Sequence, residues 1–561
     1  PRAPLATPPT CGEKTVTTDL VPYSAYPEPP AARVADPRLI AHPGDTFTIQ
    51  CTPGLGGFAP LFSAGTVNPT AGAFSPFAVR IERPDGQQVI NGVTVEMPPG
   101  LIANLRGVPL CSDADANAGT CDLGSKIGTA IIGAGAGSQP FFTAPEHGSV
   151  YITEGYKGGP YGLSVVVRAI AGPYDLGTVV VRSAIYVDPT DAHLTVVSDP
   201  LPIILEGIPL RVRSINVDIN RPGFTINPTS CGEKQIRATM FSPSGAQSTQ
   251  VARFQVGDCQ ALPLRPRFAM RLTGRRQMRE GRHPGLRTVV TQGPGQANMK
   301  KVAVRLPLSL ALDPERAQGD DLCEYEEGLK VNPNCPESSI VGRARAFTPV
   351  LNRPLEGPVY FVKNVRFHPV TGNPIRTLPT LLIPLRGEVA INVRANTDTD
   401  RGKLVSTFGT VPDAPVSRFE LKLSGGRDGI LVATRNICRR PRSHVTDIEV
   451  DGQNGKRADQ SDRMGSPCKR RARLRGIRTL WRANRLTVAG FIARKAKRRV
   501  RVTVRCGDGR AAKSTKPRRG RFRTTLRLGR RCDDASKARV VIRYRGGPKV
   551  KKGRKVRTVR R

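Results

Sequence analysis

The phrase PTCGEK at residues 9–14 returns almost unchanged as PTSCGEK at residues 228–234. Two copies of one cysteine phrase indicate an internal repeat, which is the first feature to look for in a long chain. Ten of the twelve cysteines follow one period of about 210 residues. Cys111, for example, recurs as Cys323, and Cys121 recurs as Cys335. The repeat therefore predicts how the chain is divided into domains.

Other phrases keep the same period: VTVEMP at 93–98 returns as VAVRLP at 302–307. We therefore divide the chain into four parts and expect the first to be the tail of an earlier unit or an N-terminal cap. The parts are residues 1–51 (partial repeat or cap), 52–259 (unit 1), 260–468 (unit 2) and 469–561 (a basic module).

The local pattern of the chain is typical of short β-strands. Stretches such as Leu163–Ala169 and Gln250–Val256 are rich in β-branched residues and lie between turn-forming residues. The chain also carries 57 Gly and 50 Pro, which favours turns over long helices. We predict an all-β protein of tandem immunoglobulin-like β-sandwiches, with two sandwiches of about 100 residues in each unit. A basic β-sandwich should follow at the C-terminus.

The cysteines are predicted to form disulfides between neighbours in the sequence. None lies in a C-x-x-C pair, and six histidines are too few and too scattered for zinc sites of the usual spacing. One pairing scheme satisfies both units, although spacing alone leaves other connectivities, or buried free thiols, open. The predicted pairs are Cys11–Cys51, Cys111–Cys121, Cys231–Cys259, Cys323–Cys335, Cys438–Cys468 and Cys506–Cys532. Such a framework favours secretion into an oxidising, extracellular environment.

Four longer phrases carry a resemblance to a known group of proteins. They are RPGFTINPTSC at 221–231, GPYDLGTVVVRSAIYVDP at 172–189, SDPLPIILEGIPL at 198–210 and VPDAPVSRFELKLSGG at 411–426. They resemble an uncharacterised family of large secreted, cysteine-containing repeat proteins of high-GC Gram-positive bacteria. The resemblance covers most of residues 1–468 and implies location and architecture, without an activity. Residues 476–561 resemble a bacterial immunoglobulin-like module.

Positive charge is concentrated at the C-terminal end. The formal net charge of the chain is +42, and residues 469–561 contribute 37 Lys and Arg against 3 Asp. Arginines alternate there with apolar residues, which predicts sheets with an apolar inner face and an arginine-rich outer face. The candidate polyanion-binding residues are Arg499, Arg501, Arg505, Arg521, Arg523, Arg527, Arg539, Arg543 and Arg545.

Such a surface attracts polyanions with little selectivity. The candidate partners are anionic cell-envelope polymers, acidic polysaccharide and extracellular DNA, and the alternative is a solvated basic surface without a partner. No nucleic-acid-binding signature is present. No apolar run reaches the roughly 18 residues that a membrane helix needs.

The sequence contains no familiar catalytic motif: G-x-S-x-G, H-E-x-x-H and the P-loop are all absent. The acidic cluster CEYEEG at 323–328 is interpreted as a solvated loop, and no cofactor is expected. Calcium is the one metal considered, because Asp113, Asp115 and Asn117 match the first alternating positions of a calcium loop. The phrase NTDTDRG at 396–402 offers a second set of oxygen ligands in a predicted hairpin.

The leading hypothesis is a non-catalytic, secreted, envelope-associated or adhesive repeat protein, held to anionic polymers by its basic module. The rivals are a secreted carbohydrate-active or hydrolytic enzyme with a loop-built site, and an extracellular DNA-binding matrix protein. A pocket with two carboxylates in only one unit would favour the enzyme, whereas equivalent surfaces in both units would favour a structural role. The sequence makes no prediction about the oligomeric state.

Overall fold

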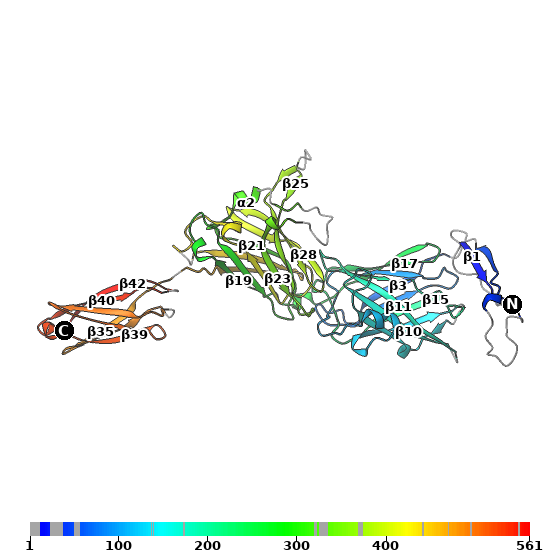
Figure 1. The fold of residues 1–561 in the computed structure, drawn as a ribbon, viewed down its shortest axis with the longest axis horizontal. Helices are drawn as coiled ribbons and strands as arrows, with labels where there is room; N and C mark the ends of the chain where they lie inside the picture. The colour runs from blue at the N-terminus through cyan, green and yellow to red at the C-terminus, as the bar shows by residue number, and fades with distance from the viewer. Residues whose placement is uncertain are drawn as a thin grey trace.

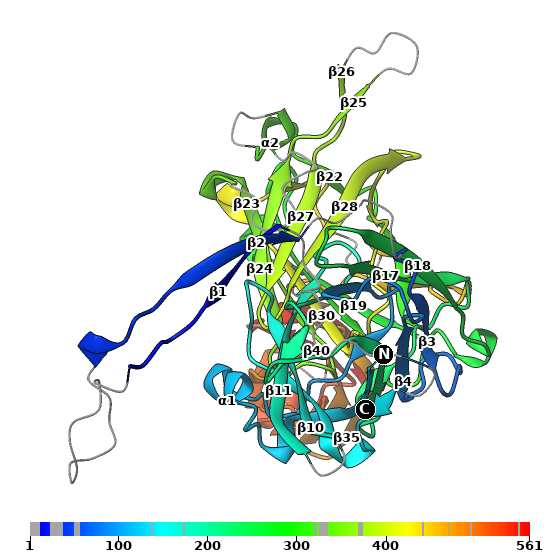
Figure 2. The ribbon, with the colours of Figure 1, turned by 90° about the vertical axis from the view of Figure 1, so that its right-hand side faces the viewer.

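A computed structural model of the chain shows a succession of β-domains along one axis (Figure 1). It describes residues 12–22, 37–49, 57–135, 137, 140–171, 174–318, 322–324, 335–367, 374–439, 443–468, 470–493, 496–547 and 550–561. An N-terminal hairpin, unit 1, unit 2 and the basic module follow one another, and Figure 2 looks along this axis from the N-terminal end. The hairpin joins β1 (Gly12–Thr17) to β2 (Gly44–Ile49).

Unit 1 is built on a single 12-stranded antiparallel sheet, in which β8 (Phe141–Phe142) pairs with β7 beside the main path. The strand order along the main path is β3 (Leu61–Thr66), β4 (Phe77–Glu82), β15 (Val212–Ile219), β7 (Lys126–Ala134), β9 (Gly148–Thr153), β10 (Tyr161–Ala171), β11 (Tyr174–Val187), β12 (Leu194–Ser198), β5 (Gly92–Glu96), β17 (Lys234–Phe241) and β18 (Gln247–Phe254).

Unit 2 repeats this order strand for strand in an 11-stranded sheet. The corresponding strands are β19 (Arg267–Thr273), β20 (Gly285–Thr291), β30 (Arg418–Leu423), β23 (Ile340–Phe347), β24 (Leu355–Val362), β27 (Thr380–Arg386), β28 (Ala390–Asp400), β29 (Lys403–Phe408), β21 (Met299–Arg305), β32 (Val445–Gly452) and β33 (Arg457–Arg463). The all-β class and the tandem repeat are therefore confirmed.

The sheet order differs from the expectation of two sandwiches of about 100 residues in each unit. Strand β5, from the first half of unit 1, lies between β12 and β17 from its second half, and β15 lies between β4 and β7. Because early and late strands are interleaved, neither half can form its sheet alone. The first and last strands of the path, β3 and β18, also approach each other, so the sheet folds back around its own core.

Small elements complete each unit. The short pair β6 (Ile102–Ala103) and β16 (Thr225–Ile226) of unit 1 corresponds to β22 (Leu310–Leu312) and β31 (Leu431–Ala433) of unit 2. Unit 1 alone has the hairpin β13 (Ile204–Leu205) and β14 (Ile208–Pro209), and unit 2 alone has β25 (Val365–Phe367) and β26 (Pro374–Arg376). The helices are α1 (Asp113–Ala118) and α2 (Pro314–Gln318).

The 3-10 turns are brief and connect strands. They are η2 (Pro37–Leu39), η3 (Leu123–Ser125), η4 (Pro145–His147), η5 (Cys259–Ala261), η6 (Arg275–Gln277), η7 (Glu337–Ser339), η8 (Gly426–Asp428) and η9 (Arg530–Cys532).

The basic module is a separate sandwich with its own hydrophobic core. One sheet contains β35 (Arg475–Arg482), β36 (Arg485–Phe491) and β39 (Arg521–Arg527). The other contains β38 (Gly509–Thr515), β37 (Val500–Cys506), β40 (Lys537–Tyr544) and β42 (Gly553–Arg560), and β34 (Arg470–Arg471) pairs in parallel with β41 (Val550–Lys551). Val500, Val502 and Val504 are fully buried, as their alternation with arginine predicts.

Five of the six predicted disulfides are present. They are Cys111–Cys121, Cys231–Cys259, Cys323–Cys335, Cys438–Cys468 and Cys506–Cys532. Cys11 and Cys51 lie outside the described residues. Disulfides persist in oxidising, extracytoplasmic environments, and five of them assign the chain to such an environment. In the described part of the chain, no helix has the length and apolar composition required to span a bilayer.

Candidate functional site

The arginines of the basic module lie on exposed strand positions, and all nine predicted residues are exposed. They divide between the two sheets: Arg521, Arg523 and Arg527 lie on β39, whereas Arg501, Arg505, Arg539 and Arg543 lie on β37 and β40 of the other sheet. Arg499 and Arg545 directly adjoin β37 and β40. The module therefore presents arginines on both outer faces of a sandwich.

The register of the four-stranded sheet aligns these arginines into rows across the strands. Arg501 lies opposite Arg543, which lies opposite Arg554. In a second row, Arg505 lies opposite both Arg510 and Arg539. Neighbouring strands are about 4.8 Å apart, and like charges directly opposite each other destabilise a sheet. We call these six residues the arginine rows.

Among the described residues, no carboxylate forms an ion pair with any member of the arginine rows. Thr503, Val541 and Ala512 occupy the positions between the two rows, so a less polar strip separates two lines of charge. On the opposite sheet a third line joins Arg482, Arg485 and Arg527. The sequence analysis missed Arg510 and Arg554, because only the register of the sheet places them in line with the predicted arginines.

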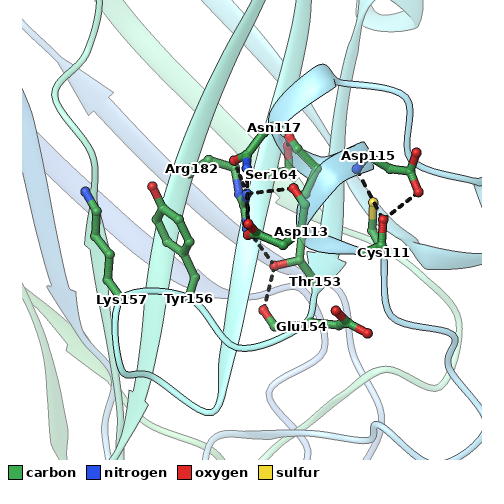
Figure 3. Close-up of polar contacts among 12 residues, drawn as sticks. Cys111, Asp113, Asp115, Asn117, Thr153, Glu154, Tyr156, Lys157, Ser164 and Arg182 are labelled. Carbon is green, nitrogen blue, oxygen red and sulfur yellow. Dashed lines mark hydrogen bonds and ion pairs between the residues drawn. The ribbon is translucent and has the colours of Figure 1, made fainter.

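The candidate calcium residues Asp113, Asp115 and Asn117 do not converge on one point. They lie in helix α1, where Asp113 and Asn117 face the buried guanidinium group of Arg182 (Figure 3). Arg182 Nη1 donates to Asp113 Oδ1 at 3.0 Å and also to Asn117 Oδ1. Asp115 instead accepts from the hydroxyl group of Ser112, the N-cap residue of the helix, at 2.6 Å.

Arg182 is the centre of a polar cluster on the outer face of β10 and β11. Its guanidinium carbon lies 4.2 Å from the centre of the Tyr156 ring, and its Nη2 donates to Thr153 Oγ1 at 3.3 Å. The Tyr156 hydroxyl group donates to Asp199 at 2.6 Å, and this hydrogen bond raises the pKa of Tyr156. The cluster holds α1 and its disulfide loop against the sheet, so Asp113 and Asn117, which were considered as calcium ligands, already contact a protein cation.

The second candidate calcium phrase also has protein partners. Asn396, Asp398 and Asp400 alternate along the exposed end of β28. Asp400 accepts from Arg305 Nε at 3.1 Å, and Asp398 accepts from the Thr399 backbone amide at 2.7 Å. The carboxylates at the end of β28 therefore already bind neighbouring protein groups.

In the part of the chain that the structure describes, one three-residue group has side chains close enough to share a metal ion. The ligand atoms of Asp188, Asp191 and His193 lie within 4.8 Å of one another in the turn between β11 and β12. His193 Nδ1 lies 2.7 Å from Asp191 Oδ1, and the Thr190 amide donates to Asp188 at 2.8 Å. These hydrogen bonds shape the turn itself.

A pocket of ≈ 380 Å³ in unit 2 bears on the enzyme hypothesis. Its lining includes His283, Asp313, Glu315 and Arg316. His283 Nε2 lies 2.7 Å from Asp313 Oδ2, so the carboxylate orients the imidazole ring. Of the acidic cluster CEYEEG, Glu324 pairs with Lys363 at 2.5 Å, and this contact lowers the pKa of Glu324. The rest of that cluster lies outside the described residues.

The junction between the units contains a buried carboxylate that the sequence analysis did not single out. Asp413 is 5% exposed and accepts hydrogen bonds from the backbone and hydroxyl groups of Thr229 and Ser230 at 2.7–3.2 Å. Asn298 Nδ2 donates to the same carboxylate at 2.8 Å. Gly100 packs against it with φ +94°, and a Cβ atom at Gly100 would lie 2.6 Å from Pro228 Cβ.

Apolar side chains surround this polar contact. A single hydrophobic cluster includes Leu105 and Phe224 of unit 1 together with Val350 and Ile391 of unit 2. The Leu105 amide donates to the Val350 carbonyl at 2.9 Å, and Tyr161 Oη lies 3.4 Å from Glu388 Oε2. The two units therefore share a core, and the junction is a packed interface.

No protein-family model and no curated protein match the chain. Solved structures with some likeness include a 1.5-MDa bacterial ice-binding adhesin (TM-score 0.17, 7% identity, 89% of this chain and 96% of that chain). A second is a tetra-tandem repeat from the extending region of a large adhesion protein (TM-score 0.15, 10% identity, 90% of this chain and 99% of that chain). A third is a type II cohesin dyad from the adaptor ScaA scaffoldin of Acetivibrio cellulolyticus (TM-score 0.16, 8% identity, 72% of this chain and 96% of that chain). TM-scores this low carry no argument about function.

Proposed function

We propose that the chain is a non-catalytic extracellular spacer, and that its basic module attaches it to anionic polymers of a cell envelope. The arginine rows carry this proposal. Six exposed guanidinium groups face one another across adjacent strands, without a carboxylate partner among the described residues. A polymer with regularly spaced anionic groups would neutralise a whole row at once and release the counterions held there.

The repeat units support the spacer role. Both have the same strand order, and they share a packed, disulfide-stabilised core. Two stiff units of this kind would hold the basic module at a fixed distance from whatever lies at the other end. Arg521, Arg523 and Arg527 on the opposite face would let the module contact polymer on two sides.

The test compares two variants, each of which loses six positive charges from a different part of the chain. One full-length variant changes the arginine rows (Arg501, Arg505, Arg510, Arg539, Arg543 and Arg554) to Gln. The matched control changes six exposed arginines of unit 2 to Gln, namely Arg265, Arg267, Arg271, Arg275, Arg276 and Arg279. Binding to immobilised poly(glycerol phosphate) is measured across a salt series, because each phosphate contact adds to the salt dependence.

We expect the module variant to bind at least tenfold more weakly with a flatter salt slope, and the control to bind almost as the natural chain does. Equal weakening of both variants would contradict the proposal, because net charge alone would then explain binding. Duplex DNA serves as the second polymer. Tight binding to DNA alone, persisting at high salt, would favour the DNA-binding matrix protein instead.

The His283–Asp313 pair favours a second candidate, a secreted hydrolase acting in the pocket of unit 2. A carboxylate-oriented imidazole can act as a general base, and Glu315 supplies a second carboxylate in the same pocket. The natural chain and a His283→Ala variant would be compared for release of reducing sugar from bacterial wall polysaccharide. Activity that is lost in the variant would establish the enzyme, and we expect none in either chain.

A further inference from the structure

Each repeat unit has two ends along the long axis of the molecule. We call the end that faces the N-terminal hairpin proximal and the end that faces the basic module distal (Figure 1). The distal end of unit 1, which includes β6 and residues 104–108 and 224–230, covers the proximal end of unit 2. That proximal end consists of the β23–β24 turn, the β27–β28 turn and the β29–β30 loop. Gly107 N donates to Asn352 Oδ1 at 3.0 Å, and Asn392 N donates to the Pro189 carbonyl at 2.6 Å. A cavity of ≈ 320 Å³ between the two ends is lined from both sides by apolar residues.

At the equivalent proximal end of unit 1, no described segment covers the large apolar side chains. The described parts of the β7–β9 connection and the β12–β15 loop lie there, and they are the same connections in the shared strand order. Four large apolar residues there are 42–51% exposed: Phe141, Phe142, Ile204 and Ile208. Ile204 and Ile208 belong to the β13–β14 hairpin, which unit 2 lacks.

An apolar cavity of ≈ 370 Å³ extends from this end into unit 1. Its lining includes Phe141, Leu205 and Ile208 at the end of the unit and Val165 and Val181 deeper inside. Val165 and Val181 are only half-buried, whereas Ile383 and Val393, their counterparts on β27 and β28, are buried. The inner face of unit 1 is therefore less enclosed than that of unit 2, which has a neighbouring unit over its end.

We propose that the open proximal end of unit 1 is a docking face for the distal end of another repeat unit of the same type. Contiguous exposed apolar residues at the edge of a core mark a partner site. The partner chemistry follows from the junction that exists, because the equivalent face of unit 2 is already covered by a distal end. This proposal is independent of polymer binding by the basic module.

The position of the cysteine phrase supports this choice of occupant. At the junction, Thr229 and Ser230 of PTSC hold Asp413 of the following unit. The related PTC stands at residues 9–11, ahead of unit 1, so the phrase precedes both units in the sequence. Near the end of unit 2 the corresponding residues 436–438 are Asn, Ile and Cys, and the basic module follows that unit. A head-to-tail contact of this kind extends a row of units, since each addition leaves one proximal end open.

The first test counts open apolar ends with 8-anilinonaphthalene-1-sulfonate, a dye that fluoresces on apolar surfaces. In the natural chain, Phe141→Asp combined with Ile204→Asp should remove most of the dye signal. An unchanged signal would overturn the proposal, because the open face would not be apolar in solution.

A second chain carries residues 52–259 twice in succession. Docking leaves one open end, so this chain should bind the same amount of dye as the natural chain. A twofold signal would mean that the copies do not dock.

A paired variant separates failed docking from failed folding. In the chain with two copies of unit 1, Leu105→Asp in the first copy should break the new contact and double the dye signal. Leu105 is buried at the junction, whereas Leu123 is 74% exposed, so Leu123→Asp in the same copy is the matched control and should change nothing. Disulfide mapping checks that each variant is folded.

A long-chain fatty acid recovered from the purified natural chain by organic extraction would overturn the proposal in favour of a lipid site.

Discussion

Asp413 is the residue on which the junction between the units depends most. It is buried without a cationic partner among the described residues, and it is held by donors from Thr229, Ser230 and Asn298. A buried carboxylate is tolerated only when hydrogen bonds replace its hydration. Since the donors belong to both units, the contact is made only when the units are correctly docked.

Replacing Asp413 by alanine should destabilise the two units together. The substitution leaves several buried donors without an acceptor, so we expect a loss of about 2–4 kcal/mol in the free energy of unfolding. The exposed Asp398 of the same unit is the control, and Asp398→Ala should cost less than about 0.5 kcal/mol. Urea unfolding followed by circular dichroism measures both variants, and equal stability of the two would contradict the role of Asp413.

Tyr161 makes the same junction sensitive to alkaline pH. Burial first, and then the charge of Glu388, raise the pKa of Tyr161 above its ordinary value of 10.0. The folded state keeps the phenol proton that the unfolded state loses, so the stability contributed by Tyr161 is complete below pH 10 and falls as the pH rises further. Urea midpoints measured from pH 8 to 11 should therefore hold up to about pH 10 and decline above it, and Tyr161→Phe should flatten the decline. A variant with the natural slope would show that other groups cause it.

At the scale of single elements, helix α1 depends on Arg182 more than on its own sequence. An isolated helix of six residues is unstable in water. Its N-cap Ser112, the disulfide Cys111–Cys121 and the guanidinium group of Arg182 hold it in place. The planar fork of arginine serves Asp113, Asn117 and Thr153 together, which a lysine cannot do.

Arg182→Lys should loosen α1 while leaving the sheet intact. We expect faster amide hydrogen exchange in residues 112–120, which corresponds to a local loss of about 1–3 kcal/mol. Arg168, on the neighbouring strand, pairs with Asp175 on the surface, so Arg168→Lys is the control with little expected effect. Unchanged exchange in Arg182→Lys would mean that the disulfide alone holds the helix.

Calcium should not stabilise unit 1. The carboxylate of Asp113 already faces a buried cation, so a second cation would be repelled. Thermal unfolding of the full chain is compared in excess calcium and in excess chelator. We expect the same midpoint in both; a rise of several degrees with calcium would revive the metal hypothesis.

At the scale of the whole molecule, the parts follow one another along the long axis (Figure 1). The shared core makes units 1 and 2 one stiff body, and the basic module has a core of its own. A compact chain of this length would have a radius of gyration of about 24 Å. Small-angle X-ray scattering should give a clearly larger radius and an elongated distance distribution, and a value near that of a compact globule would contradict the spacer role.

The sequence by itself determined the features that depend on local pattern and on spacing. Alternating valine and arginine predicted which residues of β37 are buried, because successive side chains of a strand point to opposite faces. The common period predicted the four disulfides of units 1 and 2, because equivalent positions in two copies of one fold lie at equivalent distances. Cys506–Cys532 lies outside the period and was predicted only because the two cysteines are neighbours in the sequence. The polyanion-binding role of the nine arginines stays a prediction.

Only the tertiary structure decided what depends on contacts between distant segments. The position of β5 between β12 and β17 follows from pairing across the unit, and no local pattern contains it. Asp113 and Asn117 matched a metal loop in sequence, but folding brings Arg182 to them from 65 or more residues away. From the sequence alone, Asp413 is indistinguishable from an ordinary turn residue, because it becomes buried only when a second unit docks over it.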